Sequence, residues 1–171
     1  MTIFGLCLTI FTKIMRQIDR IVIHCSATRC TQDFSPEQVR SSHLARGFRT
    51  WGYHYYIRTD GTICPMRPLD QMGAHVQGYN ASSIGICYEG GLDTLGNPAD
   101  TRTNAQKQSM NTLLQELMSK FNILYLDGHR DLSPDLNDNG TVEPCEWIKQ
   151  CPCFEVHDEY NNYLRSVIIR P

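Results

Sequence analysis

Short apolar runs along the chain predict its β-strands. Three runs are long enough for a buried strand and too short for a helix, at residues 20–26, 83–91 and 123–129. Two further segments rich in aromatic and β-branched residues, 53–58 and 62–67, flank Thr59, Asp60 and Gly61, which are typical turn residues. We therefore expect these two segments to form a β-hairpin.

Helical spacing and capping signals predict two helices between these strands. Ser35 precedes Pro36 and stands three residues before Gln38, so a helix is expected from residue 36 to about Arg46, ending at Gly47. A second capping box predicts another helix, whose core face carries apolar residues at helical spacing: Thr103 and Gln106 for the box, and Met110, Leu113, Leu114, Leu117, Met118 and Phe121 for the face. The tail, 154–170, also has a helical pattern.

Strands and helices alternate, which predicts one α/β domain with a central mixed β-sheet flanked by helices. We place this domain at residues 18–171 and interpret residues 1–17 as an N-terminal extension. The extension is too short in its apolar part to span a membrane and lacks the basic start of a signal peptide. We therefore expect no membrane span and cytoplasmic synthesis, with Met1 or Met15 as the native start.

Charge and cysteine content narrow the function. Sixteen basic and eighteen acidic residues give a formal charge of −2, so no nucleic-acid partner is expected. Four of the eight cysteines lie inside apolar runs, where a free thiol behaves as a small hydrophobic residue: Cys7, Cys25, Cys64 and Cys87. We expect most cysteines to be reduced, and only Cys151 and Cys153 to lie in a setting that suggests chemistry.

Two histidines follow predicted strands at the position where α/β sheets carry their sites. His24 and His129 each lie at the carboxyl end of a strand. Together with Cys151 they would give three protein ligands and one open position, which is typical of a catalytic zinc. Spacing alone leaves open that each is an ordinary polar or loop residue.

The segments RIVIHCSAT, WGYHYYIRTDGTI, GAHVQGYNASSIGICYEGG, DGHRDLSP and KQCPCFEV occur in this order. Together they resemble the type 2 N-acetylmuramoyl-L-alanine amidases, which include the bacteriophage T7 lysozyme type and the peptidoglycan recognition proteins. The resemblance covers about residues 18 to 157. It implies the amidase fold and zinc ligands at His24, His129 and Cys151.

The resemblance also implies roles for residues around the metal. Tyr53 and Lys149 match catalytic family positions and would donate to the oxyanion of the reaction. His54, His75 and Asn80 match positions that line the substrate groove, although in a regular strand His54 would face away from Tyr53. The implied activity is zinc-dependent hydrolysis of the amide between N-acetylmuramic acid and L-alanine in peptidoglycan, by a monomer that acts on the cell wall.

Two other functions remain open at this point. One is a non-catalytic peptidoglycan-binding module on the same fold, although such members are expected to lose the metal thiolate that Cys151 provides. The other is a cysteine peptidase that uses Cys25 or Cys151 as nucleophile with a histidine base. Alkylation distinguishes the peptidase, because zinc should shield a ligand thiolate but not a free nucleophile.

A loop between His129 and Cys151 adds a second metal hypothesis. Its spacing fits a twelve-residue calcium-binding loop, with oxygen side chains at alternate positions: Asp135, Asn137, Asn139, Thr141 and Glu146. Gly140 would allow the sharp turn. The flanks do not resemble a helix–loop–helix motif, and such residues also form Asx turns without an ion. We expect calcium, if bound, to brace the loop.

Overall fold

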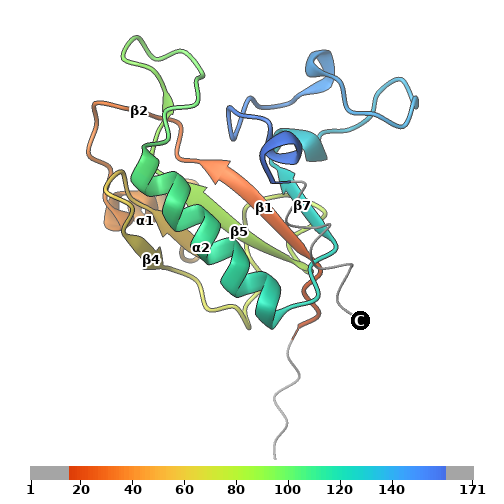
Figure 1. Cartoon of the computed structure of the whole chain (residues 1–171), viewed down its shortest axis with the longest axis horizontal. Coiled ribbons are helices and arrows are strands. Elements are labelled where there is room, and N and C mark those ends of the chain that lie inside the picture. The colour runs from red at the N-terminus through yellow and green to blue at the C-terminus, as the bar shows by residue number, and fades with distance from the viewer. Residues whose placement is uncertain (1–15, 161–171) are drawn as a thin grey trace, which may run out of the picture.

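The structure, a computed structural model of the chain, describes residues 16–160 (Figure 1). Its elements follow in the order β1 (Arg20–Cys25), β2 (Thr28–Arg29), α1 (Pro36–Ala45), β3 (Tyr55–Ile57), β4 (Ile63–Pro65), β5 (Ser83–Tyr88), β6 (Gly91–Leu92), α2 (Asn104–Lys120), β7 (Tyr125–Gly128), η1 (Arg130–Leu132) and η2 (Pro144–Glu146). The backbone is helical again from residue 156 to 160, and most of the predicted tail helix lies outside the described residues.

A five-stranded mixed sheet forms the centre of the domain, in the order β4-β3-β5-β1-β7. Strands β3, β5, β1 and β7 are parallel, and β4 pairs antiparallel with β3 as the second strand of the predicted hairpin. The predicted α/β domain with a mixed sheet is therefore confirmed. A short two-stranded sheet of β2 and β6 was not predicted, because two-residue strands carry no periodic signal.

Alternation along the strands divides the interior into two cores. Ile21 and Ile23 of β1 and Ile84 and Ile86 of β5 pack with the apolar stripe of α2, which crosses one face of the sheet (Figure 1). On the opposite face, Val39 of α1 packs with the buried residues Tyr56, Met66 and Cys87. Because successive side chains point to opposite faces, His24 lies on the α1 side of the sheet.

Both main helices begin at the predicted capping boxes. The side chains of Ser35 and Thr103 accept hydrogen bonds from the backbone N–H groups of Gln38 and Gln106. In return, each glutamine side-chain oxygen accepts from the backbone N–H of its cap residue. In addition, the Gln106 amide donates to the carbonyls of Ile57 and Glu89, so α2 is fixed to the ends of two sheet strands. The local capping signal thus also sets the tertiary position of this helix.

Arg16 already contacts the domain, although it lies within the expected extension. Its guanidinium donates to the backbone carbonyls of Leu69, Ala81 and Ser83. Residues 1–15, which hold the rest of that extension, lie outside the described residues. Among the residues that are described, no helix is both long and apolar enough to cross a membrane.

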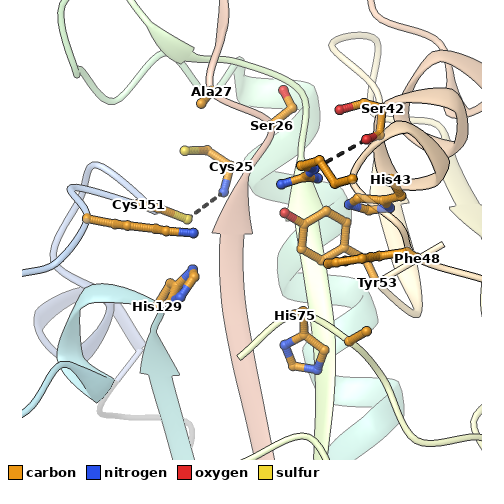
Figure 2. Close-up of a pocket in the computed structure, with 13 residues that line it drawn as sticks. Cys25, Ser26, Ala27, Ser42, His43, Phe48, Tyr53, His75, His129 and Cys151 are labelled. Atoms are coloured by element: carbon orange, nitrogen blue, oxygen red, sulfur yellow. Dashed lines mark hydrogen bonds between the residues drawn. The ribbon is translucent and has the colours of Figure 1, made fainter. Parts of the chain in front are cut away.

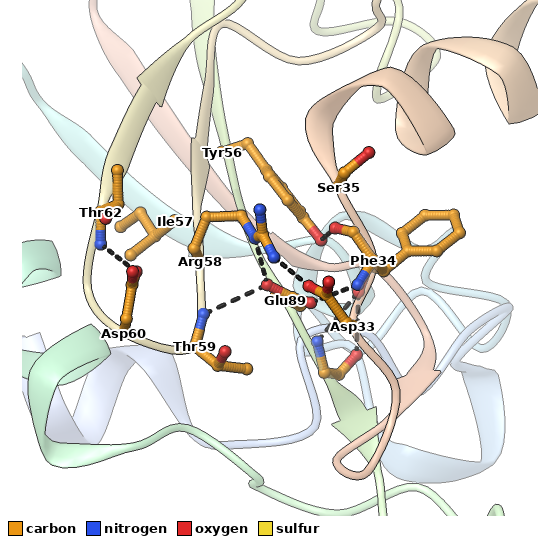
Figure 3. A network of polar contacts seen from close by, with 12 residues as sticks. Asp33, Phe34, Ser35, Tyr56, Ile57, Arg58, Thr59, Asp60, Thr62 and Glu89 are labelled. Atoms are coloured by element: carbon orange, nitrogen blue, oxygen red, sulfur yellow. Dashed lines mark hydrogen bonds and ion pairs between the residues drawn. The ribbon is translucent and has the colours of Figure 1, made fainter.

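A buried carboxylate ties the loop before α1 to the sheet (Figure 3). Glu89 is 1% exposed and accepts from the backbone N–H of Phe34 at 2.5 Å and from the Arg58 guanidinium at 2.6 Å. Thr59 N–H donates to the same carboxylate at 3.2 Å. Arg58 also pairs with Asp33. This network fixes the start of α1, the helix that borders the site described below.

Replacing Glu89 by alanine is expected to lower the free energy of unfolding by about 2–4 kcal/mol, because the half-buried Arg58 guanidinium and two half-buried backbone N–H groups lose their acceptor. Urea unfolding measures the loss. Glu116→Gln is the matched control, since Glu116 pairs with Lys120 on an exposed helix face and should cost less than about 1 kcal/mol. Equal losses in the two variants would show that the network does not stabilise the fold.

Candidate metal centre and active site

Parallel pairing of β1 and β7 brings the two strand-end histidines together. His24 is the fifth residue of β1, and His129 follows directly after β7. The backbone N–H of His129 donates to the Ile23 carbonyl at 3.1 Å, which continues the pairing past the end of β7. The Nδ1 atoms of His24 and His129 lie 3.1 Å apart.

Cys151 joins these histidines from a long loop. Its carbonyl accepts from the Arg130 N–H at 2.8 Å, and its Sγ accepts from the Cys25 N–H at 3.2 Å. The loop packs closely over β7, because a Cβ added to Gly128 would lie 2.6 Å from Cδ of Pro152. These contacts hold the Cys151 sulfur at the carboxyl end of β1, next to His24.

The donor atoms of these three residues fit a tetrahedral zinc site. They all lie within 4.8 Å of one another, and the Cys151 Sγ is 3.8 Å from the His24 Nδ1. Zinc with bond lengths of about 2.0 Å to nitrogen and 2.3 Å to sulfur requires ligand separations of roughly 3.3 and 3.6 Å. No other group of three metal-binding side chains was found among residues 16–160.

The electrostatic setting favours the neutral imidazoles that a metal requires. Burial lowers the pKa of His24 well below its ordinary value, and the neighbouring His75 and His129 lower it further. Burial, together with the charge of Lys149, lowers the pKa of His129 to about 4. Both rings are therefore uncharged at neutral pH and have a lone pair free for a metal.

Tyr53 and Lys149, the two predicted catalytic residues, line a pocket of about 300 Å³ together with the proposed ligands His129 and Cys151 (Figure 2). Tyr53 lies with its ring centroid 5.0 Å from that of His24, and Figure 2 shows it across the pocket from His129 and Cys151. Burial raises the pKa of the Tyr53 phenol well above its usual value, so its O–H remains a hydrogen-bond donor. Lys149 is exposed and reaches the pocket from the cysteine loop.

His43 and Phe48 are among the residues of this pocket that the sequence analysis did not identify. His43 of α1 stacks on Phe48 with ring centroids 5.1 Å apart, and the His43 ring lies 5.1 Å from that of Tyr53. The His43 Nδ1 accepts from the Gly52 N–H at 2.9 Å. Nothing in the local pattern distinguished His43 from a polar residue on a helix surface, although it is only 2% exposed.

The three residues expected to line the groove all have partners within the protein. His75 Nδ1 lies 3.0 Å from the Nε2 of His24. The Asn80 side-chain oxygen accepts from the N–H groups of His75 and Val76. His54 Nδ1 accepts from the Gly85 N–H at 2.9 Å. His75 and Asn80 also line a second pocket of about 510 Å³ that adjoins the first, whereas His54 is in neither pocket lining.

The acidic loop uses its carboxylates to bind its own backbone, so the calcium hypothesis gains no support. Asp135 accepts from the N–H groups of Asn139 and Gly140. Glu146 is buried and accepts from Leu136 and Glu143 N–H groups instead of closing a cation site. Asn137 and Asn139 form Asx turns, in which the Asn137 side chain accepts from Asn139 N–H and the Asn139 side chain from Thr141 N–H.

The cysteines within residues 16–160 are all free, as expected for most of them. Cys25 and Cys153 have their sulfurs 3.9 Å apart. Hydrogen bonding with Cys151, together with burial, raises the pKa of Cys25 to about 12. Such a thiol is protonated at neutral pH, which disfavours Cys25 as the nucleophile of a cysteine peptidase.

Acidification is expected to destabilise the metal-free protein between about pH 6.5 and pH 4. Burial lowers the pKa of both His43 and His54 to about 4. Within this window the unfolded chain binds more protons than the folded one, so each buried ring removes up to about 3 kcal/mol of stability as the pH falls. His24, His75 and His129 act in the same direction.

His43→Asn isolates one part of this effect, because its side-chain oxygen can replace the Nδ1 acceptor and does not titrate. Urea unfolding of the metal-free variant should show a shallower loss of stability between pH 6.5 and pH 4 than the native chain shows. An unchanged slope would mean that His43 is not the buried neutral ring described above.

Comparisons with known proteins identify the family of the chain. The sequence model of the family described as N-acetylmuramoyl-L-alanine amidase matches residues 15–146. The chain belongs to this amidase family. The endolysin of Klebsiella phage KP32 is 38% identical over 146 residues, which cover 85% of this chain and 87% of that protein. The endolysin of Escherichia phage T7 is 35% identical over 138 residues, covering 81% and 82%.

A solved amidase structure extends the agreement to the fold. The N-acetylmuramoyl-L-alanine amidase LysC from Clostridium intestinale has a TM-score of 0.67 and 29% identity, and the match covers 90% of this chain and 89% of LysC. The resemblance inferred from five sequence segments is thereby confirmed, as are the fold class and the assignment as a peptidoglycan amidase.

Proposed function

We propose that this amidase hydrolyses the bond between N-acetylmuramic acid and L-alanine with a zinc ion held by His24, His129 and Cys151. The observation that carries the proposal is the convergence of two neutral imidazole nitrogens and one sulfur from three separate segments within 4.8 Å. Two imidazoles and a thiolate suit zinc better than magnesium or calcium, which prefer oxygen ligands.

A bound zinc ion would act as a Lewis acid that polarises the scissile carbonyl and makes a water molecule acidic enough to attack it at neutral pH. The protein supplies the setting for that chemistry. Its ligands come from two strand ends and one loop that is hydrogen-bonded to Cys25 of β1 and to Arg130, just after β7, so their positions are fixed before substrate binds.

Tyr53 and Lys149 are proposed to stabilise the negative charge that develops on the scissile carbonyl oxygen. Both line the metal pocket, and both can donate hydrogen bonds: Tyr53 through a phenol whose pKa is raised by burial, and Lys149 through the N–H groups of its side chain. Donors that are already in place stabilise the transition state more than the uncharged amide, which lowers the barrier.

The substrate is proposed to lie along the two adjoining pockets, which share Phe48, Ala74, His75, His129 and Lys149. A muramyl peptide placed there would have its lactyl amide at the metal pocket and its remaining groups along the second pocket. One chain provides every residue of this arrangement, so we propose that a monomer acts on the cell wall.

A non-catalytic binding module on the same fold is the alternative. The retained Cys151 thiol, together with Tyr53 and Lys149 in the same pocket, favours catalysis, because binding alone does not need a third metal ligand. Mass spectrometry of purified peptidoglycan after digestion distinguishes the two. An amidase releases free stem peptides and leaves glycan strands intact, whereas a binding module leaves the polymer unchanged, and cut glycan strands would contradict both.

A further inference from the structure

A second histidine lies behind the first metal ligand. His24 turns its Nδ1 toward His129 and Cys151, and its Nε2 lies 3.0 Å from the Nδ1 of His75. If Nδ1 binds the metal, a neutral His24 must carry its proton on Nε2. That N–H then points at the Nδ1 lone pair of His75, so His24 donates this hydrogen bond and His75 accepts it.

The same reasoning continues from His75 into the sheet. Because Nδ1 of His75 accepts from His24, a neutral His75 carries its own proton on Nε2. This Nε2 lies 3.3 Å from the hydroxyl oxygen of Ser83, at the start of β5. A chain of hydrogen bonds thus runs from His24 through His75 to Ser83.

The space around the His75 ring is shaped by two glycines. A Cβ added to Gly85 would lie 2.6 Å from the ring, and one added to Gly73 would lie 2.5 Å from it. Any larger residue at either position would therefore displace the imidazole. Gly85 lies on β5 two residues after Ser83, so both face the same side of the sheet.

The backbone that carries His75 is fixed as well. Asn80 accepts from the His75 N–H at 2.8 Å and from the Val76 N–H at 3.0 Å, which closes the loop on itself. The ring of His54 packs against His75 with ring centroids 5.7 Å apart. The residues that the sequence assigned to substrate contact therefore also surround and hold one imidazole.

We propose that His75 is a positioning residue for the metal: its Nδ1 orients His24 and keeps the His24 proton on Nε2, so that the His24 Nδ1 is free to bind zinc. The inference rests on the proposed zinc site. Partners of this kind change metal affinity by about 10- to 100-fold when they are removed, because a ligand ring that can rotate or change tautomer binds more weakly.

Two nearly isosteric substitutions test the proposal. Asparagine at position 75 keeps an acceptor oxygen close to the place of the His75 Nδ1, whereas leucine has the same branched shape and no acceptor. The zinc dissociation constant is measured by competition with a chromophoric chelator. We expect His75→Leu to raise it about 10- to 100-fold and His75→Asn to leave it much closer to that of the native protein.

The outcomes separate this inference from the zinc proposal itself. If the native protein does not retain zinc, the proposed function fails. If it retains zinc and both variants bind it equally tightly, or lose it equally, the positioning role is overturned. Should His75→Leu fail to fold, nitrogen NMR of the zinc-loaded native protein decides the question: a His75 proton on Nε2 supports the proposal, and one on Nδ1 overturns it.

Discussion

His129→Ala is expected to abolish amidase activity and to reduce bound zinc from one ion per chain to a small fraction. The substitution removes one of three protein ligands from a site whose donor atoms lie within 4.8 Å of one another. Two ligands rarely hold zinc against buffer, because each lost bond increases the rate of dissociation. Metal analysis after gel filtration measures the zinc, and release of stem peptides from peptidoglycan measures the activity.

The same result is expected for His24→Ala and Cys151→Ala, and a strong chelator should inactivate the native enzyme until zinc is restored. His157→Ala is a matched control, since His157 pairs with Asp127, outside the metal pocket, and its side chain is 58% exposed. It should keep both zinc and activity. A His129→Ala protein with full activity would contradict the ligand assignment.

Tyr53→Phe and Lys149→Ala are expected to retain zinc while lowering kcat by about 10²- to 10³-fold each, the usual effect of losing one oxyanion donor. Neither residue is among the three proposed ligands, and both line the metal pocket. The loss should appear mainly in kcat, because the donors act on charge that is greatest in the transition state.

Tyr79→Phe provides the control for removal of a hydroxyl. Tyr79 is 38% exposed and contacts Arg20 through its ring, which phenylalanine preserves. Its kcat should equal that of the native enzyme. If Tyr53→Phe and Lys149→Ala also kept the native rate, both residues would be part of the scaffold and the proposed oxyanion stabilisation would be wrong. Loss of zinc in either variant would instead indicate a structural role.

Local sequence determined the elements that hold the site. The strand that carries His24, the hairpin around Gly61 and the starts of both helices follow from alternation, turn residues and capping boxes, each of which acts over a few residues. Parallel strands end at the same edge of a sheet, so two histidines at strand ends also indicated a site. The five family segments then identified the activity, which the comparisons confirm, and predicted the three zinc ligands.

Only the tertiary structure decided which contacts the loop residues and His43 of α1 make. Cys151 approaches β1 from a loop with no periodic pattern, and the acidic loop before it satisfies its own backbone N–H groups. His43 belongs to a mostly polar helix and is nevertheless buried. His75 contacts His24, which lies 51 positions earlier in the sequence. Loop side chains have no repeating direction and take their contacts from distant segments, and the contacts that bury His43 of α1 also come from outside its helix. The packing of the whole domain, rather than any local preference, therefore determines where these side chains lie.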